Sequence, residues 1–484
     1  MHPVSGVLAA VALFIVSSAA VGQVIPPSEQ PGRERERFEQ APPVLARHAG
    51  PTISLPSTTA PAGAASTFLS IRSVHVVGST IYDETQLAPL YQELIGERVS
   101  LQAAYELARK ITAKYGGDGY VLSRAIVPPQ NLDPKRADIS IQVVEGYVDT
   151  VEWPKALSRY RDFFTSYAAK ITSERPANIH TIERYLLLAG DLPGLKFSTS
   201  LRASPTHLGA STLVVAVTEK PVDAMARVDS QGSTARGPYE FLGSLTANNW
   251  LGAHDALTLT YAGALPLNEL QYLEGNYRQV VNSEGLAVFF DVNHSWGRPG
   301  TAALEALQYR TAGTQAYGGL SYPLIRSRER NLTFSGLAFL SDDDAFTLGA
   351  PFSRDRLRGV RVKADGDLAD GFGGTDQWNV TFSQGIDGLG STANGDPLAS
   401  RAAGRVDFTK VEATSAILNR CSRTSHSSSR AMGNMGSRRC SRPNNVDMAA
   451  LCSDALSTLP SLLAIRASRR AESFATICQS PGHG

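Results

Sequence analysis

The feature that most constrains the fold is an alternation of apolar and polar residues with period two over residues 222–414. Val360 and Val362, for example, alternate with Arg361, Lys363 and Asp365. Successive side chains of a β-strand point to opposite faces, so the pattern predicts strands with one apolar and one polar face. About ten such strands, separated by Gly, Asn and Asp, are typical of a transmembrane β-barrel. A soluble β-sandwich alternates in the same way and stays open as an alternative.

The first 22 residues are predicted to be a signal peptide. An apolar run over residues 7–16 is followed by small residues, with Ala20 and Gly22 at the −3 and −1 positions of a cleavage site. The run is too short to span a bilayer, which needs about 20 apolar residues. A buried core helix is the alternative, because this region lacks Lys and Arg. Export also fits the absence of cysteine from residues 23–414.

Residues 23–67 are expected to join the signal peptide to the folded part of the chain. Arg and Glu alternate over residues 33–37, within a short predicted helix at residues 28–40. On sequence alone, we interpret this helix as a solvated linker helix. Residues 41–67 are rich in Pro, Ala, Ser and Thr, which is a linker composition.

Two tandem α/β modules are predicted over residues 68–146 and 147–221. Each has the order strand, helix, helix, strand, strand. In the first, apolar residues at helical spacing between Leu101 and Tyr115 indicate an amphipathic helix. In the second, a helix ends at Gly190. Exposed sheet edges in such modules can bind an extended peptide as an added strand. The alternative is that the modules are spacers.

Composition and motifs exclude several classes of function. The 484 residues carry a net charge of +1, which argues against nucleic-acid binding. With 42% hydrophobic and 19% charged residues, the chain is neither an acidic disordered protein nor a multi-span helical membrane protein. It lacks a G-x-S-x-G elbow, a P-loop, a G-x-G-x-x-G and an H-E-x-x-H motif. Three consecutive acids at Asp342 lack the alternating spacing of a calcium loop. We therefore expect no catalytic, cofactor or metal site.

Residues 415–484 differ in chemistry from the rest of the chain. They contain nine Arg, no Lys and three acidic residues, which gives +6, whereas residues 1–414 carry −5. All the cysteines of the chain lie here, at Cys421, Cys440, Cys452 and Cys478. This segment shows no strand-like alternation, so we treat it as an aberrant tail that does not continue the barrel.

Four strings resemble the outer-membrane transporters of two-partner secretion, the ShlB-type haemolysin secretion/activation proteins. They are GYVLSRAIVPPQ at 119–130, IQVVEGYV at 141–148, ERYLLLAGDLPGL at 183–195 and YPLIRSRERNL at 322–332. The likeness covers about residues 68–414. It implies a signal peptide, a pore helix, a linker, two periplasmic POTRA domains and a sixteen-stranded outer-membrane barrel. Members export one large unfolded exoprotein, a haemolysin or adhesin, without ATP.

The resemblance assigns roles to particular segments. Residues 28–40 would be the pore helix, and residues 120–127 and 196–201 would be edge strands that bind the amino-terminal secretion domain of the exoprotein. The partner-binding residues would then be Tyr120, Val121, Leu122, Arg124, Lys196, Phe197, Thr199 and Leu201. The partners expected are the secreted exoprotein and outer-membrane lipid, with no nucleic acid, and the chain is expected to be monomeric.

The chain also departs from the family pattern. Sixteen strands of roughly 10 residues with their connections need about 300 residues after Val222, and 193 precede Ser415. The family's Arg-Gly-aromatic loop motif has no counterpart, because LRGVR at 357–361 lies in an early strand. A frameshift near codon 415 is one hypothesis, and resequencing tests it. With an incomplete barrel the chain would be non-functional as written.

The sequence therefore predicts α+β POTRA domains followed by an all-β transmembrane barrel with about ten of sixteen strands. The function expected is export of a partner exoprotein, at the outer membrane with the POTRA domains in the periplasm. Three alternatives stay open: a POTRA-containing assembly factor for outer-membrane proteins, a soluble exported β-rich binding protein and, least favoured, an enzyme.

Overall fold

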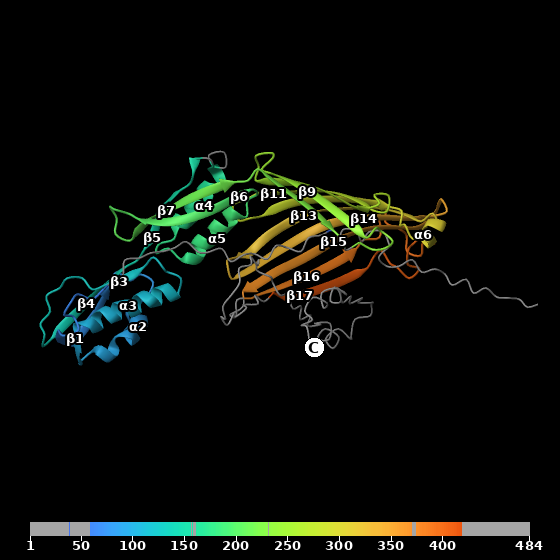
Figure 1. Cartoon of the computed structure of the whole chain (residues 1–484). Coiled ribbons are helices and arrows are strands. Elements are labelled where there is room, and N and C mark those ends of the chain that lie inside the picture. Colours follow the sequence, from blue (N-terminus) through green and yellow to red (C-terminus); the bar gives the residue numbers. More distant parts are fainter. Residues whose placement is uncertain are drawn as a thin grey trace, which may run out of the picture.

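The computed structural model describes residues 38, 59–155, 157, 161–230, 232–369 and 374–418. Within these residues two small α/β modules are followed by one large curved sheet (Figure 1). The predicted signal peptide, the predicted pore helix apart from Phe38, most of the linker and the tail beyond residue 418 lie outside the described residues. In the described part of the chain, no helix is long and apolar enough to cross a membrane.

The first module is a four-stranded sheet covered by helix α3. Its strands lie in the order β2-β1-β4-β3, with β1 parallel to β4 and the other pairs antiparallel. Leu107, Ile111 and Tyr115 of α3 are buried against this sheet, as the helical spacing predicts. The elements are β1 (Phe68–Val77), α2 (Glu84–Leu87), the 3-10 turns η2 (Ala88–Leu90) and η3 (Gln92–Leu94), β2 (Arg98–Ser100), α3 (Leu101–Gly117), β3 (Arg124–Ile126) and β4 (Ala137–Val144).

The second module is a three-stranded sheet, in the order β5-β7-β6, with two helices packed on it. Asn178 caps the N-terminus of helix α5, because its side chain accepts a hydrogen bond from the His180 backbone N–H, and the helix ends at Gly190 as expected. The elements are β5 (Tyr147–Glu152), α4 (Arg161–Ser173), α5 (Ile179–Gly190), β6 (Leu195–Ala203) and β7 (Ala210–Glu219).

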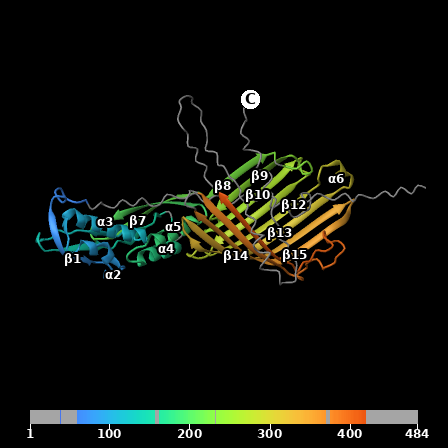
Figure 2. The same cartoon turned by 90° about the horizontal axis from the view of Figure 1, so that it is seen from below.

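The remaining strands form one antiparallel sheet in which every strand pairs with its neighbours in sequence. The bounds are β8 (Val222–Asp229), β9 (Tyr239–Asn248), β10 (Asp255–Leu265), β11 (Gln271–Val280), β12 (Ala287–Gly297), β13 (Arg310–Arg326), β14 (Arg330–Thr347), β15 (Ala350–Ala369), β16 (Thr375–Gly385) and β17 (Thr409–Leu418), with a short helix α6 (Ala302–Ala306) before β13. Seen from below, the strands lie side by side and inclined to the long axis of the molecule (Figure 2).

This sheet has ten strands, which confirms the number expected from the alternation. Strands β8 and β17 are its two edges and do not pair with each other within the described residues. The last strand continues past residue 414, because Ser415 pairs with Trp378 and Leu418 pairs with Thr375. The predicted boundary at Ser415 therefore falls inside β17.

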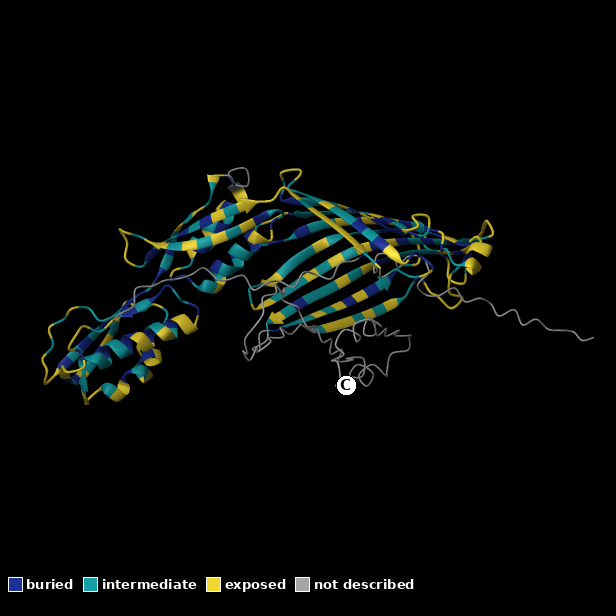
Figure 3. Ribbon diagram, in the orientation of Figure 1, coloured by how far each residue is buried: buried dark blue, intermediate teal, exposed yellow. Residues whose placement is uncertain are grey.

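The two faces of the sheet differ as the period-two pattern predicts (Figure 3). We call the face that carries Val360 and Val362 the outer face, and the face that carries Arg361 and Lys363 the inner face. Val362 is 55% exposed, whereas Ser383 on the inner face is 2% exposed. Large exposed side chains of the outer face include Leu245, Leu259, Leu273, Phe290, Val292, Phe334, Val360, Trp378 and Phe382. An exposed apolar surface of this extent marks a contact with lipid or another protein.

In the first module, the Glu145 carboxylate ties the end of β4 to the turn before α2. It accepts hydrogen bonds from the Thr80 N–H at 2.7 Å, the Ile81 N–H at 3.2 Å and the Tyr115 hydroxyl at 2.8 Å. Burial alone would raise the pKa of Glu145, but these hydrogen bonds and one from the Thr80 hydroxyl outweigh it and lower the pKa. The charged carboxylate therefore stabilises the folded module.

The charged Glu145 carboxylate contributes to the free energy of unfolding of the module. We expect this contribution to be present above the unfolded-state pKa of about 4.3 and to be lost as the pH falls through the folded-state pKa. Glu145→Gln should increase hydrogen exchange at α3 amides near neutral pH, and the difference from wild type should vanish at about pH 3. Glu106→Gln, on the exposed side of α3, is the control. A Glu145→Gln effect of equal size at both pH values would contradict the assignment.

Candidate partner-binding and pore-mouth site

Strand β6 is an edge strand of the second module, as predicted for residues 196–201. It pairs with β7 along its whole length, and its other side carries no strand in the described part of the chain. Lys196 faces solvent, whereas Phe197 and Leu201 pack against the core of the module. Thr199 lies on the same side as Phe197. The edge is thus open to an added strand, and contact of these residues with a partner stays a prediction.

The predicted strand at residues 120–127 is largely wrong. Only Arg124–Ile126 form a strand, β3, at the edge of the first sheet. Tyr120, Val121 and Leu122 lie in a turn, where the Tyr120 N–H donates to the Tyr115 carbonyl and the Ser123 N–H to the Tyr120 carbonyl. The chain reverses here because Gly119, at φ +92°, adopts a left-handed conformation that few other residues accept.

Leu122 instead joins the two modules. It is 6% exposed and belongs to the core of the second module, and Val121 packs beside it. Two backbone hydrogen bonds of 2.9 Å cross the junction, from Ile179 to Gly119 and from Ala177 to Gly146. A Cβ on Gly146 would lie 2.2 Å from the Leu122 carbonyl oxygen, so only glycine fits this contact. The two modules are therefore fixed relative to each other.

The second module is also bound to the large sheet through Glu284, which lies in the turn between β11 and β12. Its carboxylate accepts a hydrogen bond from the Tyr185 hydroxyl at 2.9 Å. It also forms ion pairs with Lys170 and Arg184, both at 3.4 Å. Burial and the hydrogen bond to Glu284 raise the pKa of Tyr185. One carboxylate at the end of the sheet thus contacts both helices of the module.

The turn between β13 and β14 makes a second contact with the same module. Arg326 donates two hydrogen bonds of 2.7 Å to the Asp191 carboxylate, and Arg328 pairs with Glu183 at 3.4 Å. The Arg184 guanidinium donates to the Leu324 carbonyl at 3.3 Å. The side chain of Arg326 is 12% exposed and that of Asp191 is 37% exposed, so the ion pair is partly exposed to water. The contact was missed in the sequence because 135 residues separate Arg326 from Asp191.

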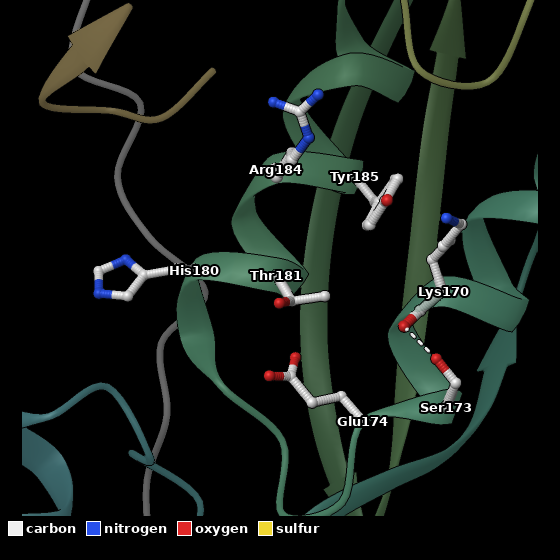
Figure 4. Close-up of a pocket in the computed structure, with 7 residues that line it drawn as sticks. All are labelled: Lys170, Ser173, Glu174, His180, Thr181, Arg184 and Tyr185. Carbon is white, nitrogen blue, oxygen red and sulfur yellow. Dashed lines mark hydrogen bonds between the residues drawn. The ribbon is translucent and has the colours of Figure 1, made fainter. Parts of the chain in front are cut away.

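A shallow groove of about 420 Å³ lies between α4 and α5, beside the Glu284 contact (Figure 4). Its lining includes two cationic side chains that also reach Glu284. The lining residues are Lys170, Ser173, Glu174, His180, Thr181, Arg184 and Tyr185. The groove therefore lies next to the end of the sheet that faces the modules.

The inner face of the sheet is polar, as predicted. The Arg361 guanidinium lies over the rings of Phe339 at 4.2 Å and Tyr317 at 5.7 Å. Asn379 donates a hydrogen bond of 2.5 Å to Asp365 on the neighbouring strand. Among the described residues, no group of His, Cys, Asp or Glu could hold a metal ion. This face thus carries charged and hydrogen-bonding side chains.

Phe38 is the described residue of the predicted pore helix, and it has a helical backbone. It is buried against the inner face of the sheet, in one cluster with Leu242 and Tyr272. Its ring centre lies 5.3 Å from that of Tyr272. A residue nearly two hundred positions before β9 therefore lies on the polar side of the sheet.

A comparison with family models matches residues 69–146 to the POTRA domain, ShlB-type. The first module is a ShlB-type POTRA domain. This description confirms the resemblance drawn from the sequence strings. Two curated relatives are the heme/hemopexin transporter proteins HuxB of Haemophilus influenzae strain 86-028NP and of strain ATCC 51907 / DSM 11121 / KW20 / Rd, 26% and 25% identical over 177 residues. The match covers 36% of this chain and 31% of each relative.

Among solved structures, CdiB from Escherichia coli is similar with a TM-score of 0.54 and 17% identity. The similarity covers 81% of this chain and 70% of that chain. At this identity the likeness establishes the fold, a POTRA region followed by a barrel-type antiparallel sheet. The predicted fold class is therefore confirmed, with ten strands in the described sheet.

We expect Arg326→Gln to loosen the second module from the sheet. The bidentate ion pair is partly exposed, so its loss should weaken the contact between the second module and the sheet by about 1 kcal/mol of free energy. Double electron–electron resonance between labels on α5 and on β12 should show a broader distance distribution. The double variant Asp191→Arg/Arg326→Asp should restore it.

The matched control is Arg72→Gln, because Arg72 forms a two-pronged pair with Asp138 inside the first module. This change should leave the distance between α5 and β12 unaltered. An unaltered distribution in Arg326→Gln would contradict the role of this contact.

Proposed function

We propose that this chain is an outer-membrane translocator that binds and exports a partner exoprotein in two-partner secretion. The observation that carries the proposal is the combination, in one chain, of a ShlB-type POTRA domain and a two-faced antiparallel sheet with the CdiB fold. The modules lie in the periplasm and the sheet in the outer membrane. The chain acts as a monomer and uses no cofactor.

The two faces of the sheet support this assignment. The outer face exposes large apolar side chains such as Phe290 and Val362, which suit the acyl chains of a bilayer. The inner face carries Arg361, Lys363 and Asp365, which suit a wet lumen through which a polypeptide passes. Each backbone group left unpaired in lipid costs several kcal/mol. Transport therefore requires the edges β8 and β17 to be paired when the sheet is inserted.

The edge of β6 is the proposed binding site for the secretion domain of the partner. An extended segment would add beside β6 through main-chain hydrogen bonds, with Lys196, Phe197, Thr199 and Leu201 setting its side-chain preferences. Arg124 on β3 provides a second, shorter edge. Tyr120, Val121 and Leu122 contribute by fixing the angle between the two edges. The Haemophilus relatives are heme/hemopexin transporters, so a secreted heme- or hemopexin-binding protein is one class of partner.

A photo-crosslinking amino acid at Ser198, an exposed position of β6, should crosslink the amino-terminal secretion domain of a large exoprotein encoded next to this chain. The matched control is Thr150, which is exposed on β5 at the opposite edge of the same sheet. Crosslinking is expected at Ser198 and not at Thr150, and the exoprotein is expected in the medium when both proteins are produced.

Two outcomes would contradict the proposal. Retention of the exoprotein in the periplasm, with the chain recovered in the outer membrane, would exclude export of that partner. Crosslinking of Ser198 to outer-membrane protein precursors instead of the secretion domain would indicate an assembly factor.

A further inference from the structure

Arginines face outward at the end of the sheet that lies far from the modules. Along β15 the outer-face residues change from Val362 and Val360 to Arg358, Arg356 and Arg354 as the strand approaches the β14–β15 turn. This end is marked by α6 in Figure 1, and the Leu348 N–H donates to the Leu307 carbonyl just after that helix. The arginines therefore lie directly beyond the apolar part of the outer face.

Part of the positive charge of these arginines is neutralised by aspartates on the other strand of the β14–β15 hairpin. Asp342 and Asp344 on β14 share the outer face with the arginines. Arg358 pairs with Asp342 at 2.6 Å, and Arg356 pairs with Asp344 at 2.9 Å. Both of these arginine side chains are largely covered. These two pairs are a cross-strand ladder that stabilises the long hairpin.

Two further arginines are not balanced in this way. Arg354 reaches Asp344 through Nε at 3.3 Å, its side chain is 48% exposed, and its two terminal nitrogens have no acceptor in the described part of the chain. Arg310, exposed on β13, places its guanidinium 4.4 Å from the ring centre of Phe346, and no described residue accepts a hydrogen bond from it. The outward cluster thus carries two more positive than negative charges.

Arg310 and Arg354 point toward the same strip of surface. They lie on the strands that flank β14, so their backbones are two strand spacings, or about 10 Å, apart across the sheet. Arg310 extends over Phe346, and Arg354 reaches Asp344, so both guanidinium groups lie over β14. Leu340 and Val360 are exposed apolar side chains further along the outer face, and Arg356 and Arg358 lie between Arg354 and Val360 on β15. The free cationic donors thus lie at the end of the outer face, beyond the paired arginines, with the Phe346 ring beside Arg310.

We propose that Arg310 and Arg354 bind a phosphate group on the headgroup of an outer-leaflet glycolipid, whose acyl chains lie on the apolar outer face. Guanidinium groups bind phosphate through paired, charge-assisted hydrogen bonds, and their level just beyond the apolar residues is that of a lipid headgroup. A free phosphate ion would gain no contact with Leu340 or Val360. The inference depends on the proposed orientation of the sheet in the outer membrane.

The test measures binding of bisphosphorylated lipid A to the full-length chain in detergent micelles, at low salt, by native mass spectrometry. Arg310→Gln/Arg354→Gln should lower the affinity about tenfold. The matched control is Arg361→Gln, because Arg361 is on the same strand but on the inner face. Arg310→Lys/Arg354→Lys keeps the charge and should recover part of the affinity. Circular dichroism checks that all variants keep their strand content.

The outcomes separate the possible sources of binding. Equal affinity of the double Gln variant and wild type would overturn the proposal, as would an equal loss in Arg361→Gln. Dephosphorylated lipid A should bind weakly, and inorganic phosphate should not compete at equal concentration; competition by phosphate alone would overturn the lipid assignment. Export of the exoprotein without lipid A binding would refute this inference alone, whereas lipid A binding without export would refute the proposed function alone.

Discussion

The pairing of backbone hydrogen bonds from strand to strand is the constraint on which the large sheet depends. A sheet that exposes Phe290, Val362 and Trp378 on one face is suited to lipid, which offers no hydrogen-bonding partner to a backbone amide group. The simplest solution is a meander in which each strand pairs with the next, and this is the order observed from β8 to β17. The period-two pattern follows, because one face meets lipid and the other meets water and polar side chains.

Side-chain contacts, and not strand pairing, join the modules to the sheet. Apolar packing through Leu122 joins the first module to the second. Both apolar packing, with Val280 and Ala287 of the sheet in the core of the module, and ion pairs through Glu284 and Arg326 join the second module to the sheet. Polar contacts suit this position, because the turns lie at the edge of the apolar part of the sheet, where side chains meet water. The junction between the second module and the sheet thus combines a buried apolar contact with ion pairs at the turns.

Much of the fold was predictable from sequence, because alternation and helical spacing are local. The strand count and the end of α5 at Gly190 follow from such signals, whereas the edge position of β6 was an expectation from the family resemblance. Leu122 was misassigned because an apolar residue after a helix fits both a strand and a junction, and only the second module shows which applies. The contact of Arg326 with Asp191 links two of the family-like strings, but no local signal indicates that they touch.

The two ion-pair contacts of the second module with the sheet have a mechanical consequence. In the proposed function, a polypeptide held along β6 and drawn toward the lumen would pull on the second module in the direction of the strand. Glu284 and Arg326 hold that module at two separate turns. The pulling force would therefore be divided between the β11–β12 and β13–β14 hairpins and would not bend the connection at Pro221. In the proposed function the second module would therefore keep a strand bound at β6 directed toward the polar face of the sheet during export.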